Sequence, residues 1–346
     1  MKLTPDTENK KNPSNPFWDN TDLLAKILYR WNSHGILFVK AVKKRASLRN
    51  LLITRFPFRF KDSLVPPSLH IEFTNSCNLK CVYCNNPHFE HPRNIMSDEV
   101  FKQMVDHLKK SSIDRICIGG GEATIHPKFK EFTLELAKHS RILTIVSNGQ
   151  WKDESIIKTL LIAPIDFIEV SVEAGSKEDY EQMRVGGSYD LLIKNLLLLK
   201  KLRKELKSKS HINLRLMVRP SQRGKIEKES FDFWKAYGDS IMPQYVLKTE
   251  GVDTISDVFL PKQMSLDAFP KCSLPFRNIQ IRSNGDIPIC QISGSALNPA
   301  KKLIAGNILN HSMLEIWQNE TFKNYREGHR FDKHELIPIC KGCKGC

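Results

Sequence analysis

Three cysteines in the first third of the chain have the spacing of cluster ligands. Cys77, Cys81 and Cys84 follow the pattern C-x3-C-x2-C. Thiolates are the usual ligands of iron–sulfur clusters, and a [4Fe–4S] cluster normally takes four of them. Three thiolates on one short loop leave one iron without a protein ligand, and an open position is what a metal needs to bind a reactant. Structural zinc is the alternative, with His88 or His91 as its fourth ligand.

A second group of cysteines lies far along the chain. It comprises Cys272, Cys290, Cys340, Cys343 and Cys346. Four thiolates gathered in this way hold zinc or a [4Fe–4S] cluster, and their spacing alone does not choose between the two. The remaining cysteine, Cys117, stands between Ile116 and Ile118, so we expect it to be a buried, inert thiol.

The overall composition is that of a globular protein with a strong positive charge. The 346 residues include 53 Lys and Arg against 38 Asp and Glu, a net charge of +15. Residues 1–65 alone carry 13 basic and 5 acidic residues. This basic N-terminal extension is either a partly helical, solvated segment packed on the main domain or an arm that contacts a membrane surface or another anionic partner.

The N-terminal segment is polar and carries no signal-peptide pattern, which favours a cytoplasmic protein. A reducing compartment favours cysteines as metal or cluster ligands over disulfides. No run reaches the roughly 18 apolar residues of a membrane span.

Apolar strands and amphipathic helices alternate between residues 68 and 248. We predict strands at 69–73, 115–118, 142–146, 167–172, 212–218 and 243–247, and helices at 98–110, 128–139, 155–161, 177–183, 191–206 and 228–237. Such alternation predicts a parallel sheet, and six strands suit an incomplete (β/α)6 barrel. Beyond a linker near 249–271, we predict a hairpin from Asn278–Arg282 and Ile287–Gln291 and a helix over Met313–His329.

Polar and glycine-rich motifs follow the predicted strands, where α/β folds bind their ligands. The cysteine loop follows the first strand, Gly120–Gly121–Glu122 the second, and Ser147–Asn148–Gly149 the third, while Ser171–Val172–Glu173 ends the fourth. Glycines let a backbone approach a ligand closely, and a carboxylate can accept a hydrogen bond from an ammonium group.

Together these motifs resemble the signature of the radical S-adenosylmethionine (SAM) superfamily, with Cys77–Asn–Leu–Lys–Cys81–Val–Tyr–Cys84 in its Cys-Asn-Leu-Lys-Cys-x-Tyr-Cys form. The resemblance implies that the amino and carboxylate groups of SAM chelate the open iron. It also implies that one electron cleaves SAM to methionine and a 5′-deoxyadenosyl radical, which takes a hydrogen atom from the substrate. The cofactor then carries the difficult chemistry, and the protein supplies position and exclusion of water.

The same resemblance assigns roles around SAM. Gly120, Gly121 and Glu122 match the motif that holds the methionine amino group. The further SAM contacts it implies are Ser147, Asn148, Ser171, Glu173 and Arg184, with Tyr83 against the adenine. Glu173 stands where the family's Ser-x-Asp pattern has aspartate.

The C-terminal segment is similar to the short SPASM-type, or twitch, module of radical SAM enzymes. The sequences Cys272–Ser–Leu–Pro–Phe, Asn284–Gly285–Asp286, Gly306–Asn307–Ile308 and Ile316–Trp317 carry this resemblance. It implies an auxiliary [4Fe–4S] cluster on Cys272, Cys290, Cys340 and Cys343. Cys346 is surplus to this set: it could replace Cys343, be a free thiol, or have no role.

We therefore expect a basic extension at 1–65, a radical SAM core at 66–250, and a linker with an α+β cluster module at 251–346. The leading interpretation is a radical SAM oxidoreductase or lyase that dehydrogenates, dehydrates or epimerises a small polar, carbohydrate-like and anionic molecule. The alternative is modification of a ribosomally made peptide. An electron donor such as flavodoxin or ferredoxin is implied. A nucleic-acid-binding protein with zinc knuckles would explain the charge but not Gly120–Glu122, so nucleic acid is disfavoured as a partner.

Overall fold

The computed structural model describes residues 64–84, 86, 93–111, 113–246, 256–258, 272–290 and 303–341. The basic N-terminal extension lies outside these ranges, and so do Cys343, Cys346, His88 and His91, so the predictions that concern them remain predictions.

The described core is built on one parallel sheet with the strand order β8-β7-β5-β4-β3-β1-β9. Six of its strands are those expected from the sequence, and both ends of each strand lie within three residues of the predicted positions. The seventh, β9, comes from the C-terminal part of the chain and pairs with β1 in parallel register. The strands are β1 (Ser68–Glu72), β3 (Arg115–Gly119), β4 (Ile142–Ser147), β5 (Phe167–Glu173), β7 (His211–Val218), β8 (Ser240–Tyr245) and β9 (Asn278–Ile281).

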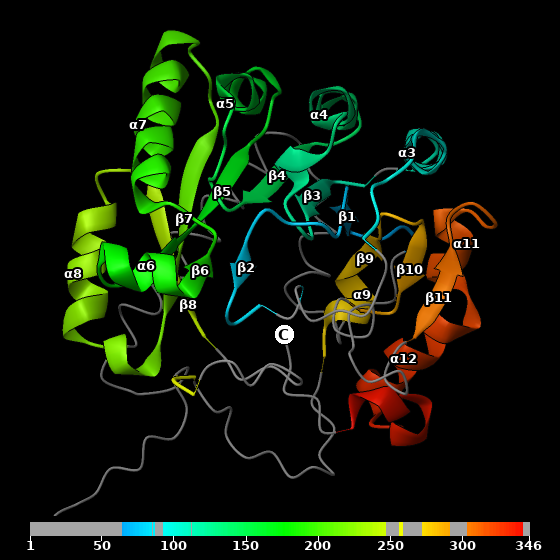
Figure 1. The fold of residues 1–346 in the computed structure, drawn as a ribbon. Coiled ribbons are helices and arrows are strands. Elements are labelled where there is room, and N and C mark those ends of the chain that lie inside the picture. The colour runs from blue at the N-terminus through cyan, green and yellow to red at the C-terminus, as the bar shows by residue number, and fades with distance from the viewer. Residues whose placement is uncertain are drawn as a thin grey trace, which may run out of the picture.

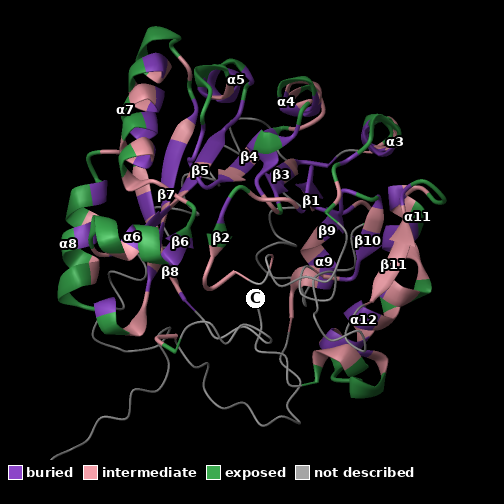
Figure 2. Ribbon diagram, in the orientation of Figure 1, coloured by how far each residue is buried: buried purple, intermediate pink, exposed green. Residues whose placement is uncertain are grey.

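Among the described residues, alternating side chains explain why the helices that follow the strands pack on one face of this sheet. Ile116 and Ile118 on β3, like Leu143 and Ile145 on β4, are almost fully buried beneath the helices. Helices α3, α4, α5, α7 and α8 follow one another around that outer face (Figure 1), and Figure 2 shows their exposed surfaces turned outward. The helices are α3 (Asp98–Lys109), α4 (Phe129–Lys138), α5 (Glu154–Ile162), α6 (Lys177–Met183), α7 (Tyr189–Glu205) and α8 (Lys225–Trp234).

Capping side chains fix the residue at which several of these helices begin. Ser97, Asp153 and Ser188 accept hydrogen bonds from the first-turn amides of α3, α5 and α7. Ser176 begins α6 with a capping box that includes Asp179. Short 3₁₀ turns, η3 (Ala123–Ile125) and η4 (Pro220–Gln222), follow β3 and β7.

The C-terminal part departs from the sequence prediction in two places. The predicted hairpin is wrong as a strand pair, because β9 pairs with β1 whereas β10 (Asp286–Pro288) pairs antiparallel with β11 (Ile304–Asn307). The turn between β9 and β10 does form, since the Arg282 amide donates to the Asp286 carbonyl.

The single helix predicted over Met313–His329 is also wrong. It consists of α11 (Met313–Gln318) and α12 (Glu320–Phe331), separated at Asn319, whose side chain caps α12 by accepting from the Phe322 amide. The module also contains α9 (Leu274–Arg277) and the 3₁₀ turns η6 (His334–Leu336) and η7 (Pro338–Cys340). Among the described residues, none of the helices has the length and apolar character needed to cross a membrane.

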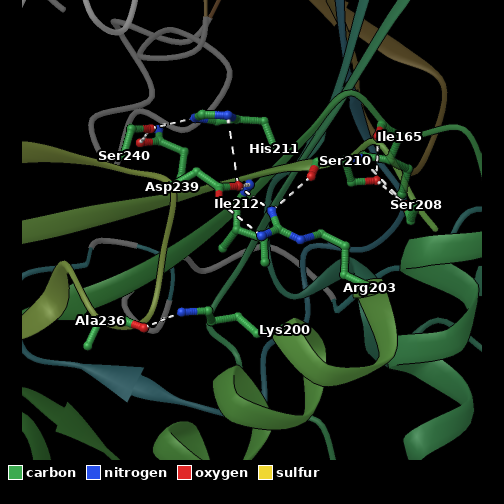
Figure 3. A network of polar contacts seen from close by, with 11 residues as sticks. Ile165, Lys200, Arg203, Ser208, Ser210, His211, Ile212, Ala236, Asp239 and Ser240 are labelled. Atoms are coloured by element: carbon green, nitrogen blue, oxygen red, sulfur yellow. Dashed lines mark hydrogen bonds and ion pairs between the residues drawn. The ribbon is translucent and has the colours of Figure 1, made fainter. Parts of the chain in front are cut away.

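A polar network ties α7 to the start of β7 and β8 (Figure 3). The Arg203 guanidinium pairs with both carboxylate oxygens of Asp239, which also accepts from the Ile212 amide. His211 and Ser240 lie 2.8 Å apart, between Nε2 and Oγ, and join the two strands. Partial burial raises the pKa of Asp239, but the hydrogen bonds from Arg203 and from the Ile212 amide outweigh it, so the pKa is lowered.

We expect Asp239→Ala to lower the free energy of unfolding by about 1–3 kcal/mol, because it removes the carboxylate that accepts from both the partly buried Arg203 and the Ile212 amide. The stabilisation by Asp239 is present above the ordinary pKa of 3.8 and is lost as the pH falls through the lower pKa of the folded state. Chemical denaturation at pH 7 measures the loss. Asp232→Ala, which removes an exposed pair with Lys235, is the control and should change little. Equal stability of the two variants would contradict the role of this network.

Candidate active site: the cysteine loop and the strand ends around it

The cysteine loop is held between the end of β1 and a short second sheet. The two-residue strands β2 (Lys80–Cys81) and β6 (Arg184–Val185) pair antiparallel and place Cys81 opposite Arg184. The Val82 amide also donates to the Met183 carbonyl. The loop that carries the three thiols is therefore anchored to the segment that follows α6.

Each of the three sulfur atoms has an N–H group within hydrogen-bonding distance. The Leu79 amide lies 3.4 Å from Cys77 Sγ, and the Asn86 amide lies 3.4 Å from Cys84 Sγ. The Arg184 guanidinium lies 4.0 Å from Cys81 Sγ. Hydrogen bonds to sulfur stabilise the thiolates that bind iron, so the loop fits a [4Fe–4S] cluster with three protein ligands.

The three thiols lie close enough to interact electrostatically, and burial raises the pKa of each. For Cys81 burial raises the pKa to about 12, although the Arg184 charge opposes the shift. These side chains would therefore be neutral without a metal, and ligation would release their protons.

Gly120 and Gly121 are required by the packing of this loop. A Cβ at Gly121 would lie 2.0 Å from the Ser76 carbonyl oxygen, and Gly120 has a φ of +114°. The Gly121 amide donates to the Thr74 carbonyl, and the Glu122 amide donates to the Ser76 carbonyl. The glycines thus let the end of β3 pack directly against the backbone that leads into Cys77.

Glu122 joins two strand ends through a buried carboxylate. Its Oε1 accepts from the Thr124 hydroxyl (2.6 Å) and the Ser147 hydroxyl (2.8 Å), and its Oε2 accepts from the Asn148 amide (2.8 Å). Only 1% of Glu122 is exposed. Burial raises the pKa of Glu122, while the hydrogen bonds from Thr124, Asn148 and Ser147 oppose that shift.

Ser147 and Asn148 connect the end of β4 to the cysteine loop. The Asn148 carboxamide donates to Asn78 Oδ1 at 2.7 Å and lies 3.8 Å from Cys77 Sγ. The sequence analysis missed Gln150 and Trp151, which follow this motif directly. Trp151 Nε1 donates to the Ser147 hydroxyl, and the Gln150 carboxamide donates to the Tyr180 hydroxyl.

Tyr83, Glu173 and Arg184 form a triad beside Cys81, in which Glu173 and Arg184 are buried and Tyr83 is partly buried. The Tyr83 hydroxyl donates to Glu173 Oε1 at 2.5 Å, and Arg184 Nε lies 2.8 Å from the same oxygen. Burial raises the pKa of Tyr83 well above its usual value, so the hydroxyl keeps its proton. Burial alone would lower the pKa of Arg184, but the surrounding acidic groups raise it, so the guanidinium stays charged.

Not every predicted SAM contact joins this network. Ser171 lies two residues before Glu173 on β5, in register with Arg215 on β7. Cys117, which was expected to be buried, is only partly buried on β3, in register with His70 on β1, and desolvation raises the pKa of its thiol to about 12.

The second group of cysteines is organised around α12. Arg326, 1% exposed, donates to the carbonyls of Pro275 and Trp317 and so ties α12 to the segment after Cys272. Cys340 Sγ lies 3.6 Å from His329 Nε2. Tyr325, on the same helix, interacts electrostatically with Cys340 and Cys290. Three of the predicted auxiliary ligands therefore belong to one module.

With this geometry in place, the comparisons with known families identify the protein's class. Residues 71–216 match the family model described as the radical SAM superfamily, and residues 272–344 match the one described as an iron-sulfur cluster-binding domain, SPASM. Together the two matches span more than half of the chain. The protein is a radical SAM enzyme with a C-terminal SPASM domain, a class that uses SAM, a SAM-binding [4Fe–4S] cluster and an auxiliary cluster.

Curated relatives share only part of their length with this chain. The tungsten-containing aldehyde ferredoxin oxidoreductase cofactor-modifying protein of Pyrococcus furiosus is 31% identical, over 30% of this chain and 30% of its own length. The mycofactocin maturase MftC of Mycobacterium tuberculosis is 26% identical, over 38% and 34%. The PqqA peptide cyclase of Granulibacter bethesdensis is 27% identical, over 35% and 32%. The matched region thus spans about a third of each relative.

Solved structures share the fold over most of the chain. The anSMEcpe enzyme with bound AdoMet and a Cp18Cys peptide gives a TM-score of 0.56 at 18% identity, over 80% of this chain and 88% of that one. Streptococcus suis SuiB bound to its precursor peptide SuiA gives 0.55 at 15% identity, over 100% and 80%. These likenesses confirm the partial barrel with a small C-terminal module.

We expect Gly121→Ala to displace the cysteine loop, because the new methyl group would clash with the Ser76 carbonyl. After anaerobic reconstitution, the iron content should fall from about eight to about four per chain. Gly224→Ala is the control for backbone strain alone, because φ there is +92° but a Cβ meets no atom within 4 Å, and it should keep the full iron content. A Gly121→Ala protein with full iron content would contradict the claim that close packing at Gly121 positions the cysteine loop.

We expect Glu122→Gln to destabilise the SAM-free protein by about 1–3 kcal/mol, because the amide replaces an acceptor of four protein donors with a group that is itself a donor. Thermal unfolding of the protein without SAM checks this, with the exposed Glu131→Gln as the control. If Glu122→Gln changed SAM affinity alone and left unfolding unchanged, Glu122 would be a SAM contact without a structural role.

Proposed function

We propose that this protein modifies a peptide by radical SAM chemistry. The observation that carries the proposal is that its relatives include a peptide cyclase, acting on PqqA, and a mycofactocin maturase. The SuiB–SuiA complex adds that a protein of this fold accommodates a precursor peptide. These findings favour the peptide alternative over the small carbohydrate-like substrate that the sequence first suggested.

In this proposal Cys77, Cys81 and Cys84 hold the SAM-binding cluster, and Cys272, Cys290 and Cys340 hold the auxiliary one together with Cys343 or Cys346. When bound, the first cluster and SAM supply a radical that abstracts hydrogen. Residues 66–250 would form the SAM domain and residues 251–346 the auxiliary domain. A reducing compartment such as the cytoplasm and an electron donor of the flavodoxin or ferredoxin class suit this chemistry.

The protein's own residues would position SAM and limit access of water. The backbone at Gly120 and Gly121 packs directly against the backbone that leads into Cys77 and so holds the cysteine loop at the strand ends where SAM would bind. The Tyr83–Glu173–Arg184 triad keeps a charged guanidinium buried next to Cys81, where it can bind a carboxylate or ribose oxygen. Asn148 is held by Asn78, so its carboxamide is fixed at the same edge of the sheet.

The test is turnover of candidate substrates by anaerobically reconstituted, full-length enzyme. We expect peptides encoded beside its gene to change mass in step with formation of 5′-deoxyadenosine, whereas phosphorylated sugars should stay unchanged. The Cys77, Cys81 and Cys84 triple variant to alanine is the control and should form neither product. Turnover of a sugar phosphate, with every such peptide left intact, would refute the peptide assignment while leaving the radical SAM chemistry in place.

A further inference from the structure

Helix α12 brings a buried histidine against a ligand of the auxiliary cluster. His329 lies in the last turn of α12 and is 2% exposed, and its Nε2 atom is 3.6 Å from Cys340 Sγ. We propose that His329 donates an N–H···S hydrogen bond to the Cys340 thiolate, and that it is a positioning residue that raises the reduction potential of the auxiliary cluster.

The direction of this hydrogen bond follows from the chemistry of the two groups. A sulfur that binds iron carries no proton, so it can only accept. The imidazole at His329 must then present Nε2–H, which makes the contact a charge-assisted hydrogen bond from a neutral donor to an anionic sulfur. Such bonds withdraw electron density from the sulfur, which favours the reduced cluster, and they are one means by which proteins set cluster potentials.

The packing around His329 leaves its ring little freedom. Gly328, the preceding residue, lies so close to the 333–337 segment that a Cβ there would be 2.6 Å from Ile337 Cγ2. The Lys333 amide donates to the Gly328 carbonyl, and Ile337 is 1% exposed. The turn that carries His329 is therefore fixed against the segment that ends at Cys340.

The same helix is fixed on its other side. Arg326 donates to the Pro275 carbonyl, and the Arg330 guanidinium lies 5.0 Å from the centre of the Phe276 ring. Pro275 and Phe276 follow Cys272 closely in the chain. Helix α12 thus fixes His329, the donor to Cys340, relative to the segment that follows Cys272. This arrangement is expected of a residue that sets the reduction potential of a cluster.

The decisive variant is His329→Phe, which keeps a planar ring of similar size but has no donor. His329→Gln is the matched rescue, because its carboxamide N–H can reach the place of Nε2–H. The exposed His334 of the same module gives the control His334→Phe. All are made in the full-length chain with Cys77, Cys81 and Cys84 changed to alanine, so that the auxiliary cluster is the one that titrates.

Reduction potentials are measured by EPR-monitored titration without substrate, so the result does not depend on the proposed peptide substrate. We expect His329→Phe to retain about four irons and to shift the midpoint to a more negative potential. His329→Gln should restore most of that shift, and His334→Phe should show none. An unchanged midpoint in a fully loaded His329→Phe protein would overturn the proposal, and so would loss of iron from both His329→Phe and His329→Gln, because His329 would then act as a ligand.

A second measurement covers the case in which His329→Phe does not fold. In the protein with His329 intact and ¹⁵N-labelled histidine, pulsed EPR of the reduced auxiliary cluster should show a weak nitrogen coupling, and His329→Gln should abolish it. A strong coupling of the size given by a directly bound nitrogen, or no coupling at all, would overturn the hydrogen-bond assignment.

Discussion

The close contact between Gly121 and the Ser76 carbonyl is the constraint on which the active site depends. No side chain fits between them, and the amides of Gly121 and Glu122 donate to the carbonyls of Thr74 and Ser76. The backbone after β3 is thereby hydrogen-bonded to the backbone that leads from β1 to Cys77. Because the strands are parallel, their carboxyl ends meet at one edge, and this contact turns that edge into a rigid support for the cysteines.

The same edge of the sheet also contains buried charged side chains. Each of them is stabilised by an opposite charge or by hydrogen-bond donors. Glu122 is surrounded by hydroxyl and amide donors, whereas Glu173 is paired with Arg184 and accepts from Tyr83. A buried carboxylate without such partners would be strongly destabilising. Glu122, Glu173, Arg184 and Tyr83, which the family resemblance assigns to SAM, therefore also hold the site together, so we expect their substitution to affect stability.

The sequence predicted the elements whose signals are local. Short apolar runs located the six barrel strands, and the cysteine spacing located the loop that is expected to hold the first cluster, because both patterns depend on neighbours in the chain. The β9 strand was paired incorrectly because its partner, β1, lies about two hundred residues away, and a turn sequence such as Ser283–Gly285 does not reveal which strands pair around it. The contacts of Glu122 with Ser147 and of His329 with Cys340 could likewise not be predicted from the sequence, because they depend on packing between separate elements.

The pairing of β9 with β1 links the segments that carry cysteines of the two groups. β1 leads directly into the loop of Cys77, and β9 lies between Cys272 and Cys290. Adjacent strands lie about 4.8 Å apart, so the Cys77 loop and the segment that carries Cys272 and Cys290 are attached to neighbouring strands of one sheet. Glu72, at the end of β1, strengthens the junction by accepting from the amide and hydroxyl of Ser283. The strand that leads into the Cys77 loop and the segment between Cys272 and Cys290 are therefore joined by backbone hydrogen bonds and by a buried carboxylate.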